Sequence, residues 1–108
     1  MFQTNEHLEA LSAEDRTALE QVVERFEAAW SRGERPDLAA CLPAGGPLRQ
    51  AILVELACAD LEYRLKAGEP ARAEAYLTRF PELAADRPAV LGLASLEFAV
   101  RRRSEPGL

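Results

Sequence analysis

Residues 61–69 read LEYRLKAGE, and residues 26–34 read FEAAWSRGE with the same spacing of apolar, acidic and glycine positions. A third stretch, residues 96–103 (LEFAVRRR), begins in the same way, so Glu27, Glu62 and Glu97 recur every 35 residues. A fixed period in the mid-thirties is typical of stacked helical units, because one such unit cannot bury its apolar face alone. The repeat therefore predicts an all-α protein of a kind that usually works by binding.

The apolar pattern around the repeat predicts five helices, three long and two short. We expect them to form one small domain of stacked antiparallel helical hairpins. Ser12 is followed by acidic residues, which is a helix-capping signature, and Gly33 can adopt the left-handed conformation that ends a helix. The predicted helices run from Ser12 to Gly33 and over 36–42, 47–66, 72–80 and 88–103. The helix at 47–66 is apolar on most faces, which predicts a central position.

These helices define one helical domain over residues 12–103. It follows a weakly structured N-terminal segment, 1–11, and precedes a linker or tail, 104–108. Aromatic residues at repeated positions are expected in the core rather than in a ligand cage, and Trp30, Leu56, Tyr76 and Phe80 should be largely buried. Tyr63 and Phe98 fall in the same group of core aromatics. The residues expected to matter for the structure are Trp30, Gly33, Gly68, Tyr76, Phe80 and Pro81.

Composition limits the classes of function. The chain has 108 residues and a formal net charge of −5, all of it within residues 1–31, which argues against a nucleic-acid-binding surface. No apolar run approaches the roughly 20 residues that span a bilayer, and the N-terminus lacks the features of a secretory signal. Cys41 and Cys58 lie in apolar helical patterns, as reduced core thiols would. We therefore expect a cytoplasmic protein without a membrane segment.

The sequence carries no recognisable catalytic or ligand-binding motif. His7 is the one histidine and has no cysteine at metal-ligand spacing, so neither a metal nor a cofactor is expected. A Cys–His nucleophile pair stays open. Gly45-Gly46 lacks the surrounding pattern of a phosphate-binding loop. We expect this chain not to be an enzyme.

Two charged surfaces are the candidate interaction sites. One is the acidic face of the first helix, with Glu20, Glu24 and Glu27, and the other is the arginine run Arg101, Arg102 and Arg103. The arginines have two interpretations. They would either complement the dipole at the C-terminal end of the last helix, or contact an acidic partner or an adjoining domain.

Several stretches resemble the helical N-terminal region of planctomycete-type bacterial serine/threonine protein kinases. The resemblance lies in residues 53–56 (LVEL), 60–64 (DLEYR), 68–70 (GEP) and 75–83 (AYLTRFPEL), with similar elements at 26–30, 33–36 and 96–103. It covers about residues 20–103, although the third unit lacks the Tyr-Leu-x-x-Phe-Pro element. No kinase motif is present, so the resemblance implies an accessory, non-catalytic segment and transfers no catalytic residue.

The expected function is a protein-interaction or regulatory module at the N-terminus of a signalling protein, with a protein partner, an adjoining kinase domain or a second copy as its target. The alternative is a free-standing helical adaptor or inhibitor whose acidic first helix contacts a basic surface on another protein. Small-ligand sensing and an unsuspected enzymatic activity stay open beside these two.

Overall fold

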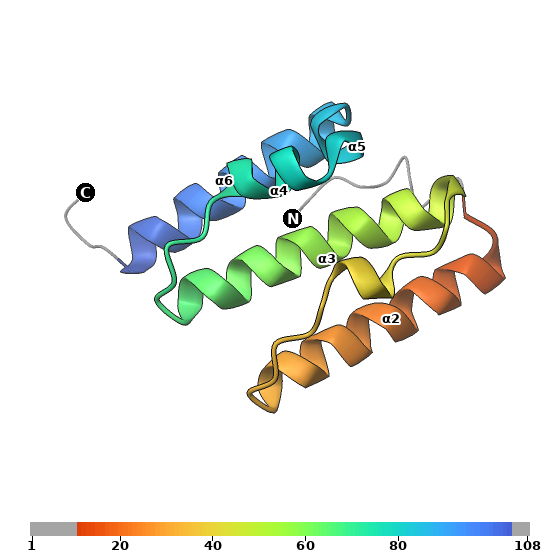
Figure 1. Ribbon diagram of the computed structural model, residues 1–108, viewed down its shortest axis with the longest axis horizontal. Helices are drawn as coiled ribbons and strands as arrows, with labels where there is room; N and C mark the ends of the chain where they lie inside the picture. The colour runs from red at the N-terminus through yellow and green to blue at the C-terminus, as the bar shows by residue number, and fades with distance from the viewer. Residues whose placement is uncertain (1–10, 105–108) are drawn as a thin grey trace.

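The computed structural model describes residues 11–104, and all regular structure in this range is helical (Figure 1). The long helices are α2 (Ala13–Ser31), α3 (Gly46–Lys66) and α6 (Arg87–Ser104). The short elements are the 3-10 turn η1 (Ala39–Cys41) and the helices α4 (Ala73–Arg79) and α5 (Pro81–Ala84). The prediction of a small all-α domain with three long and two short helices is confirmed. The N-terminal segment and the tail fall mostly outside the described residues, although Leu11 is buried and α6 extends to Ser104.

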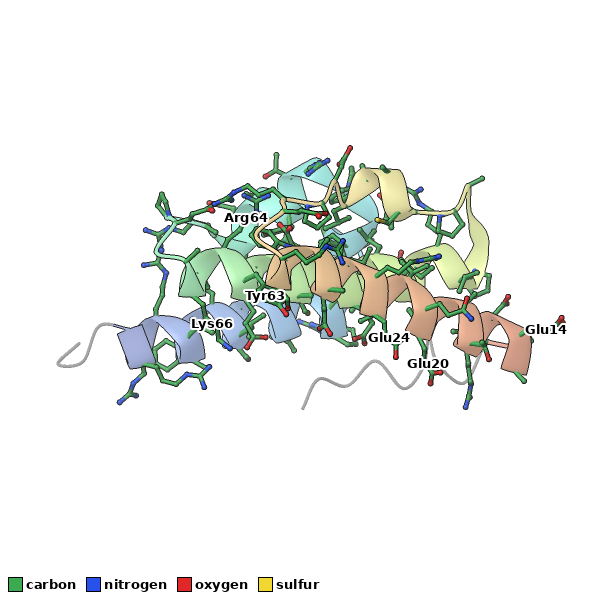
Figure 2. The ribbon with its side chains drawn as sticks, turned by 90° about the horizontal axis from the view of Figure 1, so that it is seen from below. Glu14, Glu20, Glu24, Tyr63, Arg64 and Lys66 are labelled. Carbon is green, nitrogen blue, oxygen red and sulfur yellow. The ribbon has the colours of Figure 1, made fainter. Side chains whose placement is uncertain are left out.

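The helix α3 lies in the centre, with α2 on one side and α6 on the other (Figure 1). All three long helices run in the same direction, because the segments after α2 and α3 return along the domain before the next long helix begins. Accordingly Trp30, near the end of α2, stacks on Tyr63, near the end of α3, with ring centroids 5.5 Å apart. Each hairpin therefore joins a long helix to a short segment that runs back against it, and Figure 2 shows η1 and α4 on the same side of α3.

The three long helices bury one set of equivalent positions that are 35 residues apart. Phe26, Leu61 and Leu96 have exposed fractions of 2%, 0% and 9%, each on the face that its helix turns to the core. The apolar surface of α3 extends almost all round it because α2, α6 and the short helix α5 contact it. The predicted central position of the helix at 47–66 is confirmed.

The ends of the long helices follow the predicted capping. The Ser12 hydroxyl accepts a hydrogen bond from the Asp15 amide at 3.1 Å and so caps α2. Gly33 and Gly68 have φ angles of 86° and 87°, the left-handed conformation expected after a helix. In each case the next residue donates its amide back to the last turn, from Glu34 to the Ala29 carbonyl and from Glu69 to that of Arg64. Both chain reversals therefore have the same backbone geometry.

The short elements differ from the prediction. The expected helix at 36–42 is only the turn η1, because the Asp37 carboxylate accepts the Ala39 amide at 3.2 Å and Pro43 holds Leu42 in an extended conformation. The expected helix at 72–80 is α4, and α5 was not predicted. Pro81 ends α4 as expected, but it also occupies the first position of α5, where its missing amide costs nothing.

The aromatic residues divide into buried and exposed groups. Tyr76 and Phe80 are buried as predicted, as is Leu56. Trp30 and Tyr63 are only half-buried, because their stacked rings lie at the edge between α2 and α3. The prediction that Phe98 belongs to the core is wrong, since its side chain is 62% exposed. It lies on the face of α6 opposite the one that packs on α3, and no described element covers that face.

Candidate functional site

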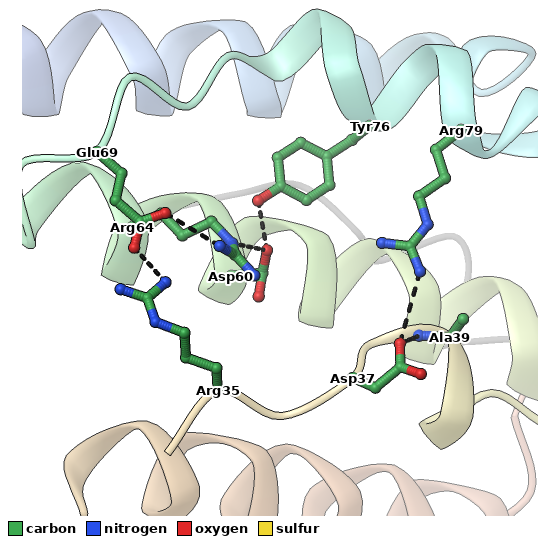
Figure 3. A network of polar contacts seen from close by, with 8 residues as sticks. All are labelled: Arg35, Asp37, Ala39, Asp60, Arg64, Glu69, Tyr76 and Arg79. Carbon is green, nitrogen blue, oxygen red and sulfur yellow. Dashed lines mark hydrogen bonds and ion pairs between the residues drawn. The ribbon is translucent and has the colours of Figure 1, made fainter. Parts of the chain in front are cut away.

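A buried polar network joins the two hairpins (Figure 3). Asp60 of α3 is the one charged residue that is buried in the described part of the chain, at 5% exposure. Its Oδ2 accepts hydrogen bonds from the Tyr76 hydroxyl at 2.5 Å and from Arg64 Nε at 2.8 Å. Arg64 also donates to Glu69 at 3.0 Å, and Glu69 pairs in turn with Arg35 from the segment after α2. The network therefore connects α3, α4 and the returning segment of the first hairpin.

Aromatic contacts extend this network to α2. The guanidinium groups of Arg35 and Arg64 each lie 5.3 Å from the centre of the Trp30 ring. Such cation–π contacts stabilise by about 0.5–2 kcal/mol, depending on how far the cation is shielded from water. Every charged member of the network thus has a partner within the fold, which indicates a structural role.

Tyr76 is a hydrogen-bond donor at the centre of the network. Burial, with the hydrogen bond to the negatively charged Asp60 as a second cause, raises the pKa of Tyr76 above its ordinary value. The phenol therefore stays protonated and acts as a donor. It offers neither a base nor a nucleophile at neutral pH.

The two cysteines are free thiols without activation. Burial raises the pKa of Cys58 to about 12, with smaller contributions from Glu55 and Glu62. Burial also raises the pKa of Cys41. Because the thiolate is the nucleophile, these raised pKa values keep both side chains predominantly in the less reactive thiol form at neutral pH. The described residues contain no group of three or more metal-ligating side chains, and His7 lies outside them.

The predicted acidic surface is present on α2. Glu20, Glu24 and Glu27 are all exposed, and the first two project from the helix in Figure 2. Together with Glu55 of α3, Glu20 and Glu24 line an open groove whose apolar lining is Leu19 and Val23. The acidic face is therefore solvent-accessible and lies along the α2–α3 boundary.

The arginine run does not form one surface. Arg101 Nε lies 3.1 Å from Glu97 Oε2, and Glu97 also accepts the amide of Ala73 at the start of α4. The Arg102 guanidinium instead lies over the Phe98 ring, 5.5 Å from its centre. Arg103 is exposed. Glu97 therefore links α6 to α4, and Arg101 pairs with this carboxylate within α6, whereas Arg102 and Arg103 are exposed.

The acidic and basic surfaces lie apart, because α2 and α6 are on opposite sides of α3. Glu14, in the first turn of α2, and Lys66, in the last turn of α3, lie toward opposite ends of the domain (Figure 2). Parallel helices align their dipoles, with the positive ends together at one end of the domain and the negative ends at the other. Acids in the first turn of α2 and bases in the last turns of α3 and α6 complement these ends. This arrangement favours the dipole interpretation for part of the arginine run.

Sequence reasoning missed the exposed face of α6. Its exposed positions between Pro88 and the arginine run are Leu91, Ala94, Ser95, Phe98 and Ala99, which we call the α6 outer face. Leu91 and Phe98 are 61% and 62% exposed and are the two large apolar side chains that the described residues leave in solvent. The signal was visible in residues 88–96 (PAVLGLASL), which carry no charge. An apolar stretch of this kind predicts core packing on the sequence alone, whereas within residues 11–104 the α6 outer face has no covering element.

Comparisons of this chain with protein-family models, with curated proteins and with solved structures give no match. Within residues 11–104, no helix is both long and apolar enough to cross a bilayer.

Proposed function

We propose that this chain is a non-catalytic protein-interaction module whose contact surface is the α6 outer face. The observation that carries the proposal is the exposure of Leu91 and Phe98 on one uncharged helix face. Exposed large apolar side chains that lie together mark protein contacts more often than isolated ones do. The protonated cysteines support a non-catalytic role, and so do the contacts within the fold that each charged residue of the polar network makes.

The two ends of the helix stack differ in the way that this proposal requires. A stack of helical units needs a polar outer face at each end to remain soluble. The outer side of α2 has such a face, with Glu20, Glu24 and Arg25 among its exposed residues. The α6 outer face has no charge between Pro88 and Ala99 apart from Glu97, which is turned toward α4. Within residues 11–104, the stack therefore has a charged outer face at α2 and an apolar outer face at α6.

The resemblance to the N-terminal region of bacterial serine/threonine kinases supplies the proposed setting. In that setting the module lies in the cytoplasm, and its target is a signalling protein such as an adjoining kinase domain. In any setting, the exposure and the lack of charge of the α6 outer face favour a protein contact there.

Site-specific photo-crosslinking tests the proposal directly. A photoreactive phenylalanine analogue replaces Phe98 in one variant and Gln21, on the exposed side of α2, in the matched control. Both variants are expressed in the organism that encodes the chain, and adducts are identified by mass spectrometry. We expect one recurrent protein adduct from position 98 and none from position 21. Adducts from position 21 alone would overturn the proposal in favour of an adaptor that binds through its acidic helix.

A further inference from the structure

We propose that the partner of this module presents an acidic amphipathic helix. Its apolar stripe would pack on Leu91 and Phe98, and its carboxylates would pair with Arg87 and Arg102 at the two ends of that stripe. This inference rests on the proposed function and specifies the chemistry of the occupant.

The four residues lie on one face of α6. Their spacings of four, seven and four residues, from Arg87 through Leu91 and Phe98 to Arg102, match the repeat of a helix–helix seam. At a rise of about 1.5 Å per residue, the seam is about 22 Å long, which is the length of a four-turn helix. Between the two apolar residues lie Ala94 and Ser95, whose small side chains allow a second helix to approach closely.

The exposed charges beside this seam are positive at both ends. Arg87 and Arg102 are exposed, and Arg102 is held over Phe98 by the cation–π contact. The neighbouring acids are turned to other partners. Asp86 accepts from the Ala89 amide at 3.3 Å and from Gln50 at 3.0 Å, while Glu97 pairs with Arg101. A partner thus meets an apolar stripe with a guanidinium group at either end.

A second copy of the chain is a poorer match for this surface. An antiparallel two-fold pairing about the midpoint of Leu91 and Phe98 would set Arg87 of one copy beside Arg102 of the other. A parallel pairing would bring each arginine close to its own equivalent. Like charges placed together disfavour both arrangements, whereas carboxylates in those places would favour binding and orient it.

An anionic membrane surface is also a poorer match. The chain has a net charge of −5, and two large apolar side chains are few for a helix that lies in a bilayer interface. The exposed acids of α2 add repulsion from anionic lipids. The observations therefore favour a protein helix over a lipid surface.

Binding of two synthetic helical peptides tests the inference. Both peptides carry leucines seven residues apart, one has glutamates at both ends of the leucine stripe, and the other has lysines there. By fluorescence anisotropy with the full chain, we expect the glutamate peptide to bind about tenfold more tightly, as two partly shielded ion pairs would provide. Arg87→Glu with Arg102→Glu should invert this preference. The matched control is the double variant Arg25→Glu, Arg103→Glu, which has the same net charge as the first double variant. It should keep the preference for the glutamate peptide.

The failures of the inference and of the proposed function are distinguishable. If crosslinks from position 98 persist but the two peptides bind equally, the acidic helix is wrong and the interaction surface stands. A second outcome is that the chain floats with anionic phosphatidylserine vesicles and that the double variant Arg87→Glu, Arg102→Glu abolishes this flotation. That pair of results would overturn the inference in favour of a membrane. A dimer in analytical ultracentrifugation that Phe98→Ser dissociates would overturn it in favour of a second copy.

Discussion

The Tyr76 hydroxyl donates a hydrogen bond to Asp60 Oδ2 at 2.5 Å and so ties the short helix α4 to the centre of α3. Arg64 donates to the same oxygen, and the carboxylate is otherwise enclosed. A buried charge destabilises the fold strongly unless donors surround it, so the three side chains must fit together for the second hairpin to close.

Removing the Tyr76 hydroxyl should therefore weaken the fold. Tyr76→Phe keeps the ring but leaves Asp60 with one fewer donor, and we expect a loss of about 1–3 kcal/mol in the free energy of unfolding, measured by urea titration. Tyr63→Phe is the matched control, because it deletes a phenol hydroxyl outside this network and keeps the stacking on Trp30. Equal losses in the two variants would show that the bond to Asp60 contributes nothing specific.

Alkaline pH should destabilise the protein through two groups whose pKa values the fold raises. Cys58 titrates near its ordinary pKa of 9.0 in the unfolded chain but near 12 in the folded protein, and the pKa of Tyr76 is likewise raised above 10.0. Over this range the unfolded chain binds fewer protons, so stability is complete below about pH 9 and falls as pH rises. Each group contributes a slope of at most about 1.4 kcal/mol per pH unit. In urea titrations from pH 8 to pH 11, Cys58→Ala should flatten the decline from about pH 9 and Tyr76→Phe only above about pH 10. A decline identical in both variants and the parent would contradict this assignment.

Replacing a phenylalanine by alanine should cost much more stability at position 80 than at position 98. Phe80 is 6% exposed, and Phe80→Ala should cost about 3–5 kcal/mol because it leaves a cavity in the core. Phe98→Ala removes an exposed ring whose described contact is Arg102, so the loss should stay below about 1 kcal/mol. Thermal or urea unfolding of both variants measures the difference. A large loss for Phe98→Ala would place that ring against part of the fold and remove it from the interaction surface.

The glycines at the two chain reversals should be costly to replace for a backbone reason alone. A Cβ added at Gly33 or Gly68 would meet no atom within 4 Å, yet both residues have positive φ. We expect Gly33→Ala and Gly68→Ala to destabilise by about 1–2 kcal/mol each, the cost of the left-handed conformation for an L-residue. Gly45→Ala is the control, since Gly45 has an extended φ of 179° and equal space around it. A loss at Gly45 as large as at the other two would refute the conformational explanation.

The elements that the sequence predicted well are those set by local chemistry. Ser12, Gly33 and Gly68 fix helix ends through their own side chain or backbone freedom, so their positions could be recognised without the rest of the chain. The positions of the long helices could be predicted from the spacing of their apolar residues, which is also a local feature of the sequence. At 36–42 the Asp37 carboxylate competes with the backbone carbonyls for the amide of Ala39. The sequence does not show which acceptor wins, so the short turn could not be told from a helix.

The candidate site was harder to predict because exposure is a property of the packed domain. Apolar residues lie on more than one side of α6, so the sequence does not show which side faces the core. The exposed fractions in the packed domain show that Leu91 and Phe98 face solvent. The arginine run was similarly ambiguous. Consecutive residues on a helix point about 100° apart, so three adjacent arginines had to face three different environments.

That division of the arginine run leads to a prediction that separates its two interpretations. Arg101→Gln should lower the free energy of unfolding by about 1–2 kcal/mol, because Glu97, which accepts the amide at the start of α4, loses the nearer of its two arginine partners and keeps only the longer contact with Arg72. Arg103→Gln removes the same charge from the end of α6 but has no comparable partner within residues 11–104, so the loss should be within about 0.5 kcal/mol. If the arginines served only the helix dipole, both variants would lose the same few tenths of a kcal/mol, and about 0.5 M salt would erase both losses.

The effect of the arginines on binding should differ from their effect on stability. Arg102→Glu should slow association with the crosslinked partner and weaken its salt dependence, since an exposed charge beside the contact steers the encounter. Unfolding titrations and stopped-flow association on the three single variants test both statements, and equal behaviour of all three would mean that the run acts as one undivided charge.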